Sequence, residues 1–476
     1  MMSKLLFPRR VAILGSSGSI GRNTLEVIAE SEGRLEAVLL SVHRRTDILA
    51  AQIRQLAVRS VAEQIHAAGN RLRDDKISCK TVLPRWVVVT DELADRAPLE
   101  DLPLSVEIFF GYDALCELVR RPEIDIVLSA IVGSVGLTST WSALETGKTV
   151  ALANKESLVM GGSLITDLAH ATGGRLIPVD SEHSAIMQAL QSWRMEGGLP
   201  ESEHVAHSGT LQPLETVEQP VEQPVETLEP ATTPTEKVVS SSALCCSELP
   251  ELSADFKSVV RKLILTASGG PFRSWTLDEL AKVTVGDALI HPTWEMGKKI
   301  TVDSATLMNK ALEIIEARWF FGISVENIEI VIHPQSVVHS MVEFVDGSTL
   351  AQLSPPDMRL PIQLALNYPY RFNGPSLRLD WSKALLLEFY PPDLERFPAL
   401  ALGLEVAEVA GTAGAVVNAA NETAVNAFLE NRLAFQEIVP VCRSVLEHHH
   451  YEQRPTLARL LELDQWARKE TEQRIG

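Results

Sequence analysis

Two acidic residues in the middle of the chain have the side chains needed to hold a metal ion. Asp180 and Glu182 follow the apolar run Leu176–Val179, which predicts a buried strand. On an extended backbone the two side chains share a face, and Glu313 would add a third carboxylate. Such an oxygen-rich set suits Mg²⁺ or Mn²⁺. The same residues could instead open a helix over Ala185–Leu190, with an acidic first turn, and the sequence leaves both interpretations open.

A second set of groups, within His291–Glu316, suits a phosphate. Ser304, or Asp303 beside it, could cap the helix that follows, and a helix N-terminus attracts anions. The amide of Asn309 and the ammonium group of Lys310 lie within one helical turn of the third carboxylate. The alternative is an exposed helix with an ordinary Lys/Glu pair.

The N-terminal glycines predict a turn that binds a nucleotide phosphate. The sequence GSSGSIG (15–21) follows the apolar strand Val11–Leu14 and precedes an apolar-periodic helix that starts near Ile20. A strand, a glycine turn and a helix in this order let the backbone approach a pyrophosphate. The spacing is G-x-x-G-x-x-G rather than G-x-G-x-x-G, so a plain tight turn remains the alternative.

Arginines stand where the second strand, about Leu35–Leu40, is expected to end. An NAD site favours a carboxylate there, whereas Arg44 and Arg45 suit the 2′-phosphate of NADP. Asp47 lies nearby, so NAD remains an alternative cofactor. The two arginines could also be an ordinary solvated basic turn without a ligand.

Further elements predict how these groups are positioned. Residues 58–80 are expected to be an irregular, charged excursion, and 368–398 a connecting arm. Alternating strands and helices predict a parallel, doubly wound sheet, with Asn154, Lys155 and Glu156 just past a strand end. A turn containing Ser268 follows a later strand, and the chain from about Leu400 is expected to form a helical bundle. The expected strands are Trp86–Val89, Glu107–Phe110, Ile126–Ile131, Val150–Ala153, Leu263–Thr266, Ile328–Ile332, Val337–Phe344 and Thr349–Leu353.

Composition narrows the class of protein. The 476 residues suffice for two or three domains, and the net charge of −19 argues against nucleic acid as a partner. Residues 196–255 carry twelve acids and one lysine, so −11 of that charge is local. The repeats and prolines there predict a disordered acidic insertion, 195–256. The sequence predicts neither a signal sequence nor a membrane span. The five cysteines show neither disulfide nor zinc spacing, and these observations together favour the cytoplasm.

These segments together resemble the 1-deoxy-D-xylulose 5-phosphate reductoisomerase family. The resemblance covers the chain except 195–256 and 58–80. Its motifs are GSSGSIG (15–21), LANKESLV (152–159), PVDSEH (178–183), SGGPF (268–272), HPTWEMGKKITVDSATLMNKALEIIEARW (291–319), IHPQSVVHSMV (332–342) and NAANE (418–422).

The resemblance implies conversion of 1-deoxy-D-xylulose 5-phosphate and NADPH to 2-C-methyl-D-erythritol 4-phosphate, with Mg²⁺, Mn²⁺ or Co²⁺. It implies that the metal ligands are Asp180, Glu182 and Glu313. Catalytic roles are expected for Lys155, Glu182 and His291. The implied substrate contacts are Lys155, Ser181, Glu182, Ser268, His291, Trp294, Ser304, Asn309, Lys310 and Glu313. The implied cofactor contacts are Ser17, Gly18, Ser19, Ile20, Arg44, Arg45, Asn154, Lys155, Glu156, Met296 and Gly297.

The resemblance also implies an α/β organisation and a homodimer. A Rossmann-like NADP-binding domain (1–175) is expected, then a catalytic α/β domain with a mobile lid (176–366), an arm (367–398) and a C-terminal helical domain (399–476). Trp294 and Met296 would cover the site as part of the lid, where Glu295 is a departure from the family pattern. Two rivals remain: a metal-independent NADP-linked sugar-phosphate dehydrogenase, and an inactive NADP-binding scaffold that recruits partners through the insertion.

Overall fold

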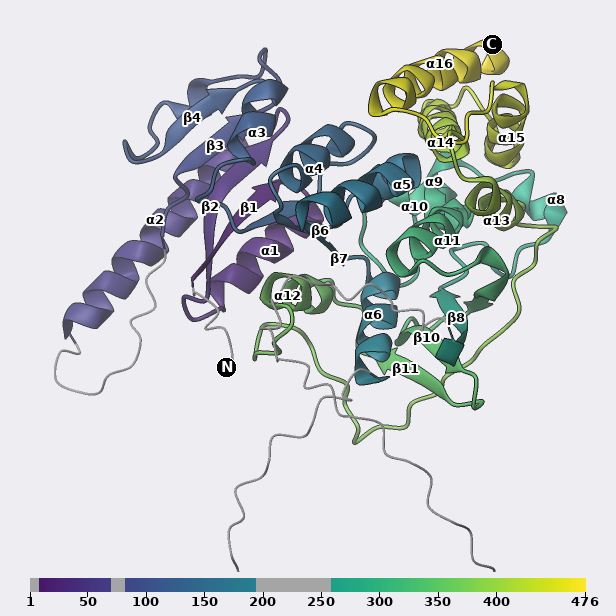
Figure 1. Cartoon of the computed structure of the whole chain (residues 1–476), viewed down its shortest axis with the longest axis horizontal. Coiled ribbons are helices and arrows are strands. Elements are labelled where there is room, and N and C mark those ends of the chain that lie inside the picture. The colour runs from purple at the N-terminus through teal and green to yellow at the C-terminus, as the bar shows by residue number, and fades with distance from the viewer. Residues whose placement is uncertain (1–7, 70–81, 194–257) are drawn as a thin grey trace, which may run out of the picture.

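A seven-stranded parallel sheet forms the N-terminal part of the molecule (Figure 1). The computed structural model describes residues 8–69, 82–193 and 258–476. The strand order is β4-β3-β2-β1-β5-β6-β7, so β2 to β4 lie on one side of β1 and β5 to β7 on the other. Such sheets bind ligands at this switch point between β1 and β5. This confirms the predicted doubly wound sheet. Its strands are β1 (Arg9–Leu14), β2 (Leu35–Val42), β3 (Trp86–Val89), β4 (Glu107–Phe110), β5 (Ile126–Ser129), β6 (Thr149–Leu152) and β7 (Arg175–Pro178).

Helices connect these strands. They are α1 (Ser19–Ala29), α2 (Thr46–Gly69), α3 (Tyr112–Leu118), α4 (Gly136–Leu144) and α5 (Lys155–Thr172), with one turn of 3₁₀ helix, η1 (Ala97–Leu99). The expectation of an irregular segment from residue 58 was wrong as far as residue 69, because α2 continues through it and projects from the sheet (Figure 1). Charged residues there suggested a loop, but the stretch has neither proline nor an internal glycine to stop a helix. Residues 70–81 lie outside the described residues.

A smaller mixed sheet forms the second α/β unit. Its order is β11-β10-β8-β9, with β8 and β9 parallel and the other pairs antiparallel. Helix α6 packs against β10 and β11. The elements are α6 (Ser181–Trp193), β8 (Val260–Ala267), α8 (Leu277–Leu280), α9 (Val285–Ala288), α10 (Lys298–Ala305), α11 (Met308–Phe321), η2 (Val325–Asn327), β9 (Ile328–Ile332), β10 (Val338–Phe344), β11 (Thr349–Leu353) and α12 (Arg359–Asn367).

The chain ends in a helical bundle. Between α12 and α13 the segment 368–398 has no helix, and a bridge joins Tyr390 to Ile332. The bundle consists of α13 (Ala399–Val409), α14 (Ala413–Leu429), η3 (Phe435–Glu437), α15 (Ile438–His448) and α16 (Leu457–Ile475). No helix in the described parts of the chain is both long and apolar enough to cross a membrane.

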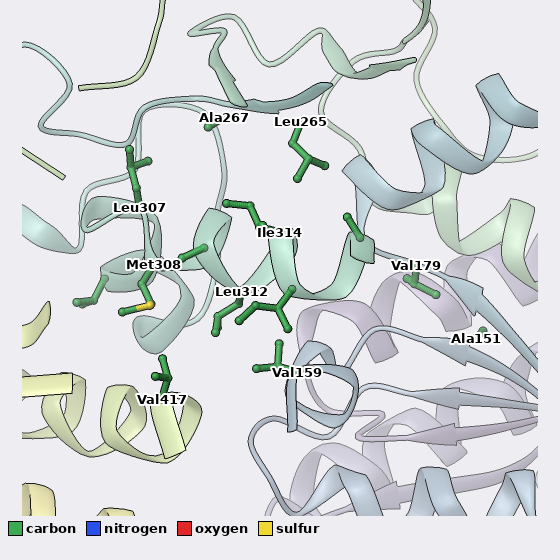
Figure 2. Packing of buried hydrophobic residues seen from close by; sticks show 14 of the residues in the cluster. Ala151, Val159, Val179, Leu265, Ala267, Leu307, Met308, Leu312, Ile314 and Val417 are labelled. Carbon is green, nitrogen blue, oxygen red and sulfur yellow. The ribbon is translucent and has the colours of Figure 1, made fainter. Parts of the chain in front are cut away.

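Helix α11 lies where these units meet. Met308 and Leu312 are fully buried, and Val159 of α5, Leu265 of β8 and Val417 of α14 surround the helix (Figure 2). On the side facing α13 the approach is close, because a Cβ atom added to Gly403 would lie 2.7 Å from the Cα atom of Ala311. Packing from three sides fixes α11 and therefore the polar side chains that it carries.

The predicted domain boundaries remain predictions. The boundary expected after residue 175 falls on the first residue of β7, which is the edge strand of the large sheet. The disorder predicted for residues 195–256 concerns a segment outside the described residues, as do Cys79, Cys245 and Cys246. Cys116 and Cys442 are free thiols.

Candidate active site

Three carboxylates from two helices converge in one place. Asp180 directly precedes α6, Glu182 lies in the first turn of α6, and Glu313 lies in α11. One oxygen atom from each lies within 4.8 Å of the other two. Residues 181–183 are helical rather than extended, and the backbone N–H of Ser181 donates to Asp180 Oδ1 at 2.9 Å. The helical interpretation of this stretch is therefore correct, and the carboxylates still meet.

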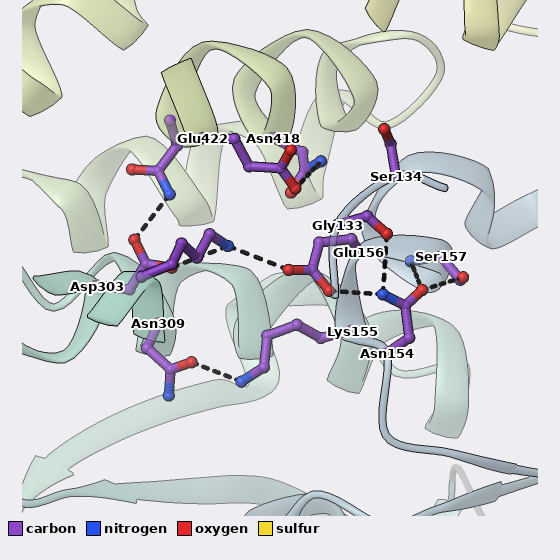
Figure 3. Close-up of polar contacts among 12 residues, drawn as sticks. Gly133, Ser134, Asn154, Lys155, Glu156, Ser157, Asp303, Asn309, Asn418 and Glu422 are labelled. Carbon is purple, nitrogen blue, oxygen red and sulfur yellow. Dashed lines mark hydrogen bonds and ion pairs between the residues drawn. The ribbon is translucent and has the colours of Figure 1, made fainter. Parts of the chain in front are cut away.

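Two lysines lie against the carboxylates. Lys155, the first residue of α5, places its Nζ atom 2.7 Å from Asp180 Oδ2 and 3.3 Å from Glu313 Oε1. Lys310 Nζ lies 2.6 Å from Glu182 Oε1 and also contacts Glu313. The Nζ atom of Lys155 also donates to Asn309 Oδ1 at 2.6 Å (Figure 3). A set of three anionic groups, compensated here by ammonium groups, suits a hard divalent cation.

Burial and neighbouring charges together set the pKa values of these groups. Burial alone would lower the pKa of Lys155, but Asp180 and Glu313 raise it well above its usual value. Burial would raise the pKa of Asp180, whereas Lys155 holds it below the usual range. Burial and the charge of Glu182 raise the pKa of Glu313 to about 7. Lys155 therefore stays an ammonium, and Glu313 is the carboxylate whose charge depends on a nearby cation.

A second group of possible metal ligands lies deeper. It comprises Asp180, His183 and Glu316, whose ligand atoms also lie within 4.8 Å of one another. The side chains of His183 and Glu316 are almost fully buried, and the Nε2 atom of His183 lies 2.9 Å from the carbonyl oxygen of Glu313. This contact links α6 to α11 behind the carboxylates. The set with Glu182 and Glu313 is the one that faces Lys310 and Asn309.

A cluster of hydroxyls surrounds His291. The Nε2 atom of His291 lies 3.1 Å from both Ser268 Oγ and Ser304 Oγ. Ser268 follows β8, and the turn after it comes close to α10, because a Cβ atom added to Gly270 would lie 2.6 Å from the Ser304 carbonyl oxygen. The structure thus brings three predicted substrate residues together from three successive segments: the turn after β8, the segment before α10, and α10 itself.

The backbone sets the tautomer of His291. Its Nδ1 atom accepts the backbone N–H groups of Thr293, at 3.1 Å, and Trp294, at 2.9 Å. In the neutral ring Nε2 must then carry the proton and donate it toward the hydroxyls. Burial lowers the pKa of His291, which favours this neutral form. The side chain is therefore a hydrogen-bond donor aimed at the position of an anion or a hydroxyl.

The predicted cap of α11 was wrong. Ser304 lies within the last turn of α10, and α11 starts two residues after Thr306, whose hydroxyl accepts the backbone N–H of Met308 at 3.2 Å. Leu307 takes the N-cap position with a φ of 60°. A break between two short helices was not visible in a continuous helical pattern. Ser304 therefore contacts His291 through its side chain and does not mark the N-terminus of a helix.

Residues expected in the lid connect His291 to α10. Trp294 is half-buried, with its ring centroid 6.3 Å from that of His339, and Glu295 is exposed. Met296 is half-buried, and Gly297 occupies the N-cap of α10. The cofactor and substrate contacts predicted for these residues remain predictions.

Hydrogen bonds fix Asn154 and Glu156 at the N-terminus of α5. Asn154 contacts the segment that directly follows β5, one of the two strands at the switch point of the large sheet. The side chain of Asn154 accepts from the backbone of Ser157 at 3.1 Å and donates to the carbonyl of Gly133 at 3.0 Å (Figure 3). It also donates to Glu156 Oε2 at 2.8 Å. Burial would raise the pKa of Glu156, but the Lys299 ammonium lowers it. Both carboxylate oxygens of Glu156 are thus occupied by donors.

The glycine turn leads into α1 as predicted. Gly15 has a φ of 87°, and Gly18 caps α1 without a side-chain hydrogen bond, which leaves backbone N–H groups for a phosphate. Ser17 is buried, Ser19 is exposed, and Ile20 is half-buried. Gly21 must be glycine here, because a Cβ atom would lie 2.5 Å from the Gly15 carbonyl oxygen.

The two arginines differ in their contacts. Arg44 is exposed and pairs with Asp91, which follows β3. Arg45 Nη1 donates to the carbonyl oxygen of Ser17 at 3.5 Å, so it lies beside the glycine turn. Of the pair, only Arg45 thus touches the turn, and the 2′-phosphate role of both remains a prediction.

Several buried polar residues at this site were not predicted from the sequence. Glu316 lies one helical turn beyond Glu313, and that spacing was an available signal. Lys299 contacts Glu156 at 3.1 Å and Asp303 at 2.9 Å, and Asn421 contacts Asp303 at 2.8 Å. Lys299 and Asp303 are four residues apart within α10, so that contact also had a local signal. No local pattern predicts the contacts with Glu156 and Asn421, because they join α10 to α5 and to α14.

Comparison with known families places the chain. A family model described as 1-deoxy-D-xylulose 5-phosphate reductoisomerase matches residues 11–81 and 65–162. Two models of the C-terminal domain of the same family match residues 240–321 and 353–470. The chain is 44% identical to the 1-deoxy-D-xylulose 5-phosphate reductoisomerase of Rhodopirellula baltica, covering 96% of this chain and 93% of the relative. It is 40% identical to that of Heliobacterium modesticaldum, covering 98% of each.

Solved structures agree with these relatives. The reductoisomerase of Zymomonas mobilis in complex with NADPH superposes with a TM-score of 0.73 at 35% identity, covering 98% of this chain and 99% of the other. A reductoisomerase in complex with NADPH, fosmidomycin and magnesium superposes with a TM-score of 0.75 at 32% identity, covering 98% of each. With this identity over nearly its whole length, the chain belongs to the 1-deoxy-D-xylulose 5-phosphate reductoisomerase family.

Proposed function

We propose that the converging carboxylates, the His291 cluster and the glycine turn are the metal, phosphate and NADPH sites of the reaction of the family. The chain is an NADPH-dependent, metal-dependent enzyme that converts 1-deoxy-D-xylulose 5-phosphate to 2-C-methyl-D-erythritol 4-phosphate, a step of non-mevalonate isoprenoid synthesis. The observation that carries the residue assignment is the meeting of Asp180, Glu182 and Glu313 within 4.8 Å. A dehydrogenase without a rearrangement, or a scaffold, has no need of this set.

The three carboxylates fit a divalent cation. All ligand atoms are oxygens, which suits Mg²⁺, Mn²⁺ or Co²⁺, and Glu313 is fully buried between the other two acids and two lysines. When bound, the cation supplies a Lewis acid for neighbouring substrate oxygens. The acids must stay fixed during turnover, and the contact of His183 with the Glu313 carbonyl holds α6 against α11.

Lys155 acts as a donor in this proposal. Because Asp180 and Glu313 raise its pKa well above the usual value, it cannot serve as a general base near neutral pH. Its ammonium group instead donates a hydrogen bond to a substrate oxygen next to the carboxylates. Asn309, 2.6 Å from Lys155 Nζ, keeps the long side chain in place.

The phosphate of the substrate binds beside the hydroxyl cluster. Ser268, Ser304 and the Nε2–H of His291 are the donors around this position. Asn309 and Lys310 of α11 are assigned to the same anion, because an amide and an ammonium group are further donors for it. Fixing the phosphate orients the reacting carbons, so its binding energy contributes to rate. Ser181 and Glu182 then contact the opposite end of the substrate.

NADPH binds along the carboxyl edge of the large sheet. The backbone N–H groups from Ser17 to Ile20 hold the pyrophosphate, and Arg45, with Arg44, faces the 2′-phosphate. Asn154, Glu156, Met296 and Gly297 lie toward the nicotinamide, which supplies the hydride. Trp294 closes over the substrate as part of the lid and limits access of water to it.

The protein acts as a homodimer in the cytoplasm. Strand β11 is an edge of the smaller sheet in the described residues, and Trp381 and Leu386 on the arm are exposed. An edge strand and exposed apolar side chains support self-association. The free thiols of Cys116 and Cys442 fit a reducing compartment.

A spectrophotometric assay tests the proposed function. NADPH oxidation is followed with 1-deoxy-D-xylulose 5-phosphate, with and without Mn²⁺, and after treatment with EDTA. We expect oxidation that requires both the sugar phosphate and the cation, and that returns when Mn²⁺ is added back to the EDTA-treated protein. Oxidation that is unaffected by EDTA would contradict the assignment of the carboxylates.

A further inference from the structure

A line of buried polar contacts joins the C-terminal bundle to the candidate active site (Figure 3). Asn421 Nδ2, on α14, donates to Asp303 Oδ1 at 2.8 Å. Asp303 Oδ2, on α10, lies 2.9 Å from Lys299 Nζ, which donates to Glu156 Oε1 at 3.1 Å. Glu156 in turn accepts from Asn154 at the start of α5. The line therefore crosses from α14 through α10 to the residues proposed to face the nicotinamide.

Asn421 enters this line only as a donor. Its side chain is buried, since Asn421 and Asp303 are 0% and 1% exposed. A carboxylate can only accept, so the amide must present Nδ2 to Asp303. The Oδ1 atom of Asn421 is buried and has no hydrogen-bond partner in the described part of the chain. An unpaired buried oxygen costs stability, which indicates that the contribution of Asn421 is the bond that it donates to Asp303.

Asp303 sits where it can control the position of α10. This helix starts directly after the lid residues Trp294–Met296, and its last turn carries Ser304, next to Asp303. Ser304 is one of the two hydroxyls 3.1 Å from His291 Nε2. A shift of α10 would therefore move the C-terminal end of the lid and one wall of the phosphate position together.

We propose that Asn421 is a positioning residue, through which the C-terminal domain sets the affinity for the sugar phosphate without touching it. Asn421 holds Asp303, Asp303 and Lys299 hold α10 against α5, and α10 places Ser304. The inference rests on the proposed role of Ser304 and His291 in binding the phosphate. It adds a residue of the NAANE segment (418–422) whose effect passes through α10.

A charge-swap series tests the proposal. Asn421→Asp sets two carboxylates against each other, and Asp303→Asn removes one partner of Lys299. In the double variant Asn421→Asp/Asp303→Asn, the new amide can donate to the new carboxylate, so the bond is restored in the reverse direction. Asn426→Asp is the matched control, because Asn426 is exposed on the same helix.

We expect Asn421→Asp to change the KM much more than the kcat. Asn421→Asp should raise the KM for 1-deoxy-D-xylulose 5-phosphate by about tenfold or more, as for loss of a buried hydrogen bond to a charged group. The kcat should change by less than about threefold, because the bond is remote from the reacting atoms. The double variant should restore KM, and the control should leave it unchanged. Hydrogen exchange of the α10 amides should accelerate in Asn421→Asp and return to normal in the double variant.

Two results would overturn the inference. The first is a folded Asn421→Asp protein with an unchanged KM; the second is a double variant whose KM is no better than that of the worse single variant. If Asn421→Asp does not fold, the comparison of Asp303→Asn with the double variant decides in the same way, with a lower KM expected for the double variant. Turnover by the unmodified enzyme tests the proposed function separately, so the two failures are distinguishable.

Discussion

Glu182 and Glu313 lie on different helices, yet both carboxylates contact the ammonium group of Lys310. Their oxygens, with that of Asp180, lie within 4.8 Å of one another. One lysine thus holds together two acids that would otherwise repel each other in a buried place. A divalent cation bound there has to compete with the lysines for the same oxygens, and this competition determines how the site responds to mutation and to pH.

Replacing Glu313 by Gln should abolish metal-dependent turnover. The amide has the shape of the carboxylate but lacks the charge, so we expect turnover to fall by at least about 100-fold, beyond the loss typical of residues that only support a ligand. NADPH binding should stay within about twofold, because the glycine turn joins β1 to α1 of the large sheet, whereas Glu313 lies in α11. Glu326→Gln, at an exposed position, is the control. Comparable turnover in Glu313→Gln would refute its role as a ligand.

Metal affinity should fall as the pH falls through 7. Burial and the charge of Glu182 raise the pKa of Glu313 to about 7, and a cation requires the ionised form. The apparent affinity for Mn²⁺ should therefore be flat above pH 7 and decrease by up to about tenfold per pH unit below it. Calorimetry in buffers of different ionisation enthalpy should detect proton release at pH 6 and much less at pH 8. Equal affinity at both values would contradict the prediction.

The same pKa makes the stability of the metal-free protein depend on pH. The pKa of Glu313 is raised from 4.5 to about 7 in the folded state, so between these values the folded protein binds the proton more strongly than the unfolded chain. The contribution of Glu313 to the free energy of unfolding therefore decreases as pH rises through this window. Denaturant titrations should show that this decrease is absent from Glu313→Gln and is reduced by Mn²⁺.

Cofactor choice should depend on the arginines after β2. Arg44→Ala with Arg45→Ala should weaken NADPH binding by about 10- to 100-fold, as for lost charged hydrogen bonds, and leave NADH nearly unchanged. The single Arg45→Ala should account for much of the effect, because Arg45 lies beside the glycine turn while Arg44 pairs with Asp91. Arg432→Ala with Arg443→Ala, on the C-terminal bundle, controls for the lost charge. Equal weakening of NADPH and NADH would remove the 2′-phosphate argument.

Strand patterns in the sequence predicted much of the fold. Trp86–Val89, Glu107–Phe110, Ile328–Ile332 and Thr349–Leu353 were predicted with the bounds that the structure shows. Trp86–Val89 is a continuous apolar run and is buried throughout, so local pattern and burial agree there. Glu107–Phe110 and Thr349–Leu353 are edge strands without a fully buried residue, and their β-branched and aromatic residues indicated them. The extent of α2 was not predicted, because a projecting helix has little apolar periodicity to reveal it.

Residues of the candidate site could be predicted only where both the residue type and its position next to an expected element indicated a ligand. Asp180, Glu182 and Glu313 were found from residue type and the expected strand end, although the local structure at Glu182 is helical. The contact between Asn421 and Asp303 was not predictable, because neither residue differs locally from an ordinary helical polar residue. Only the packing of α14 on α10 brings them together.

His291 should affect substrate affinity through its donor at Nε2. Because Thr293 and Trp294 donate to Nδ1, the proton of the neutral ring is at Nε2, 3.1 Å from Ser268 and Ser304. His291→Ala should raise the KM for the sugar phosphate by about tenfold or more, since a donor to an anion is lost. The Kd of NADPH should be unchanged. Burial lowers the pKa of His291, so its ring should remain neutral to below its usual pH, and the imidazole resonances followed by NMR should show this directly.

His448→Ala, at the end of α15, provides the matched histidine control. A His291→Ala enzyme with normal KM would show that the ring does not bind the phosphate. An effect on KM that appears only below pH 6 would instead assign the role to the protonated ring, and would contradict the tautomer that the two backbone N–H groups impose.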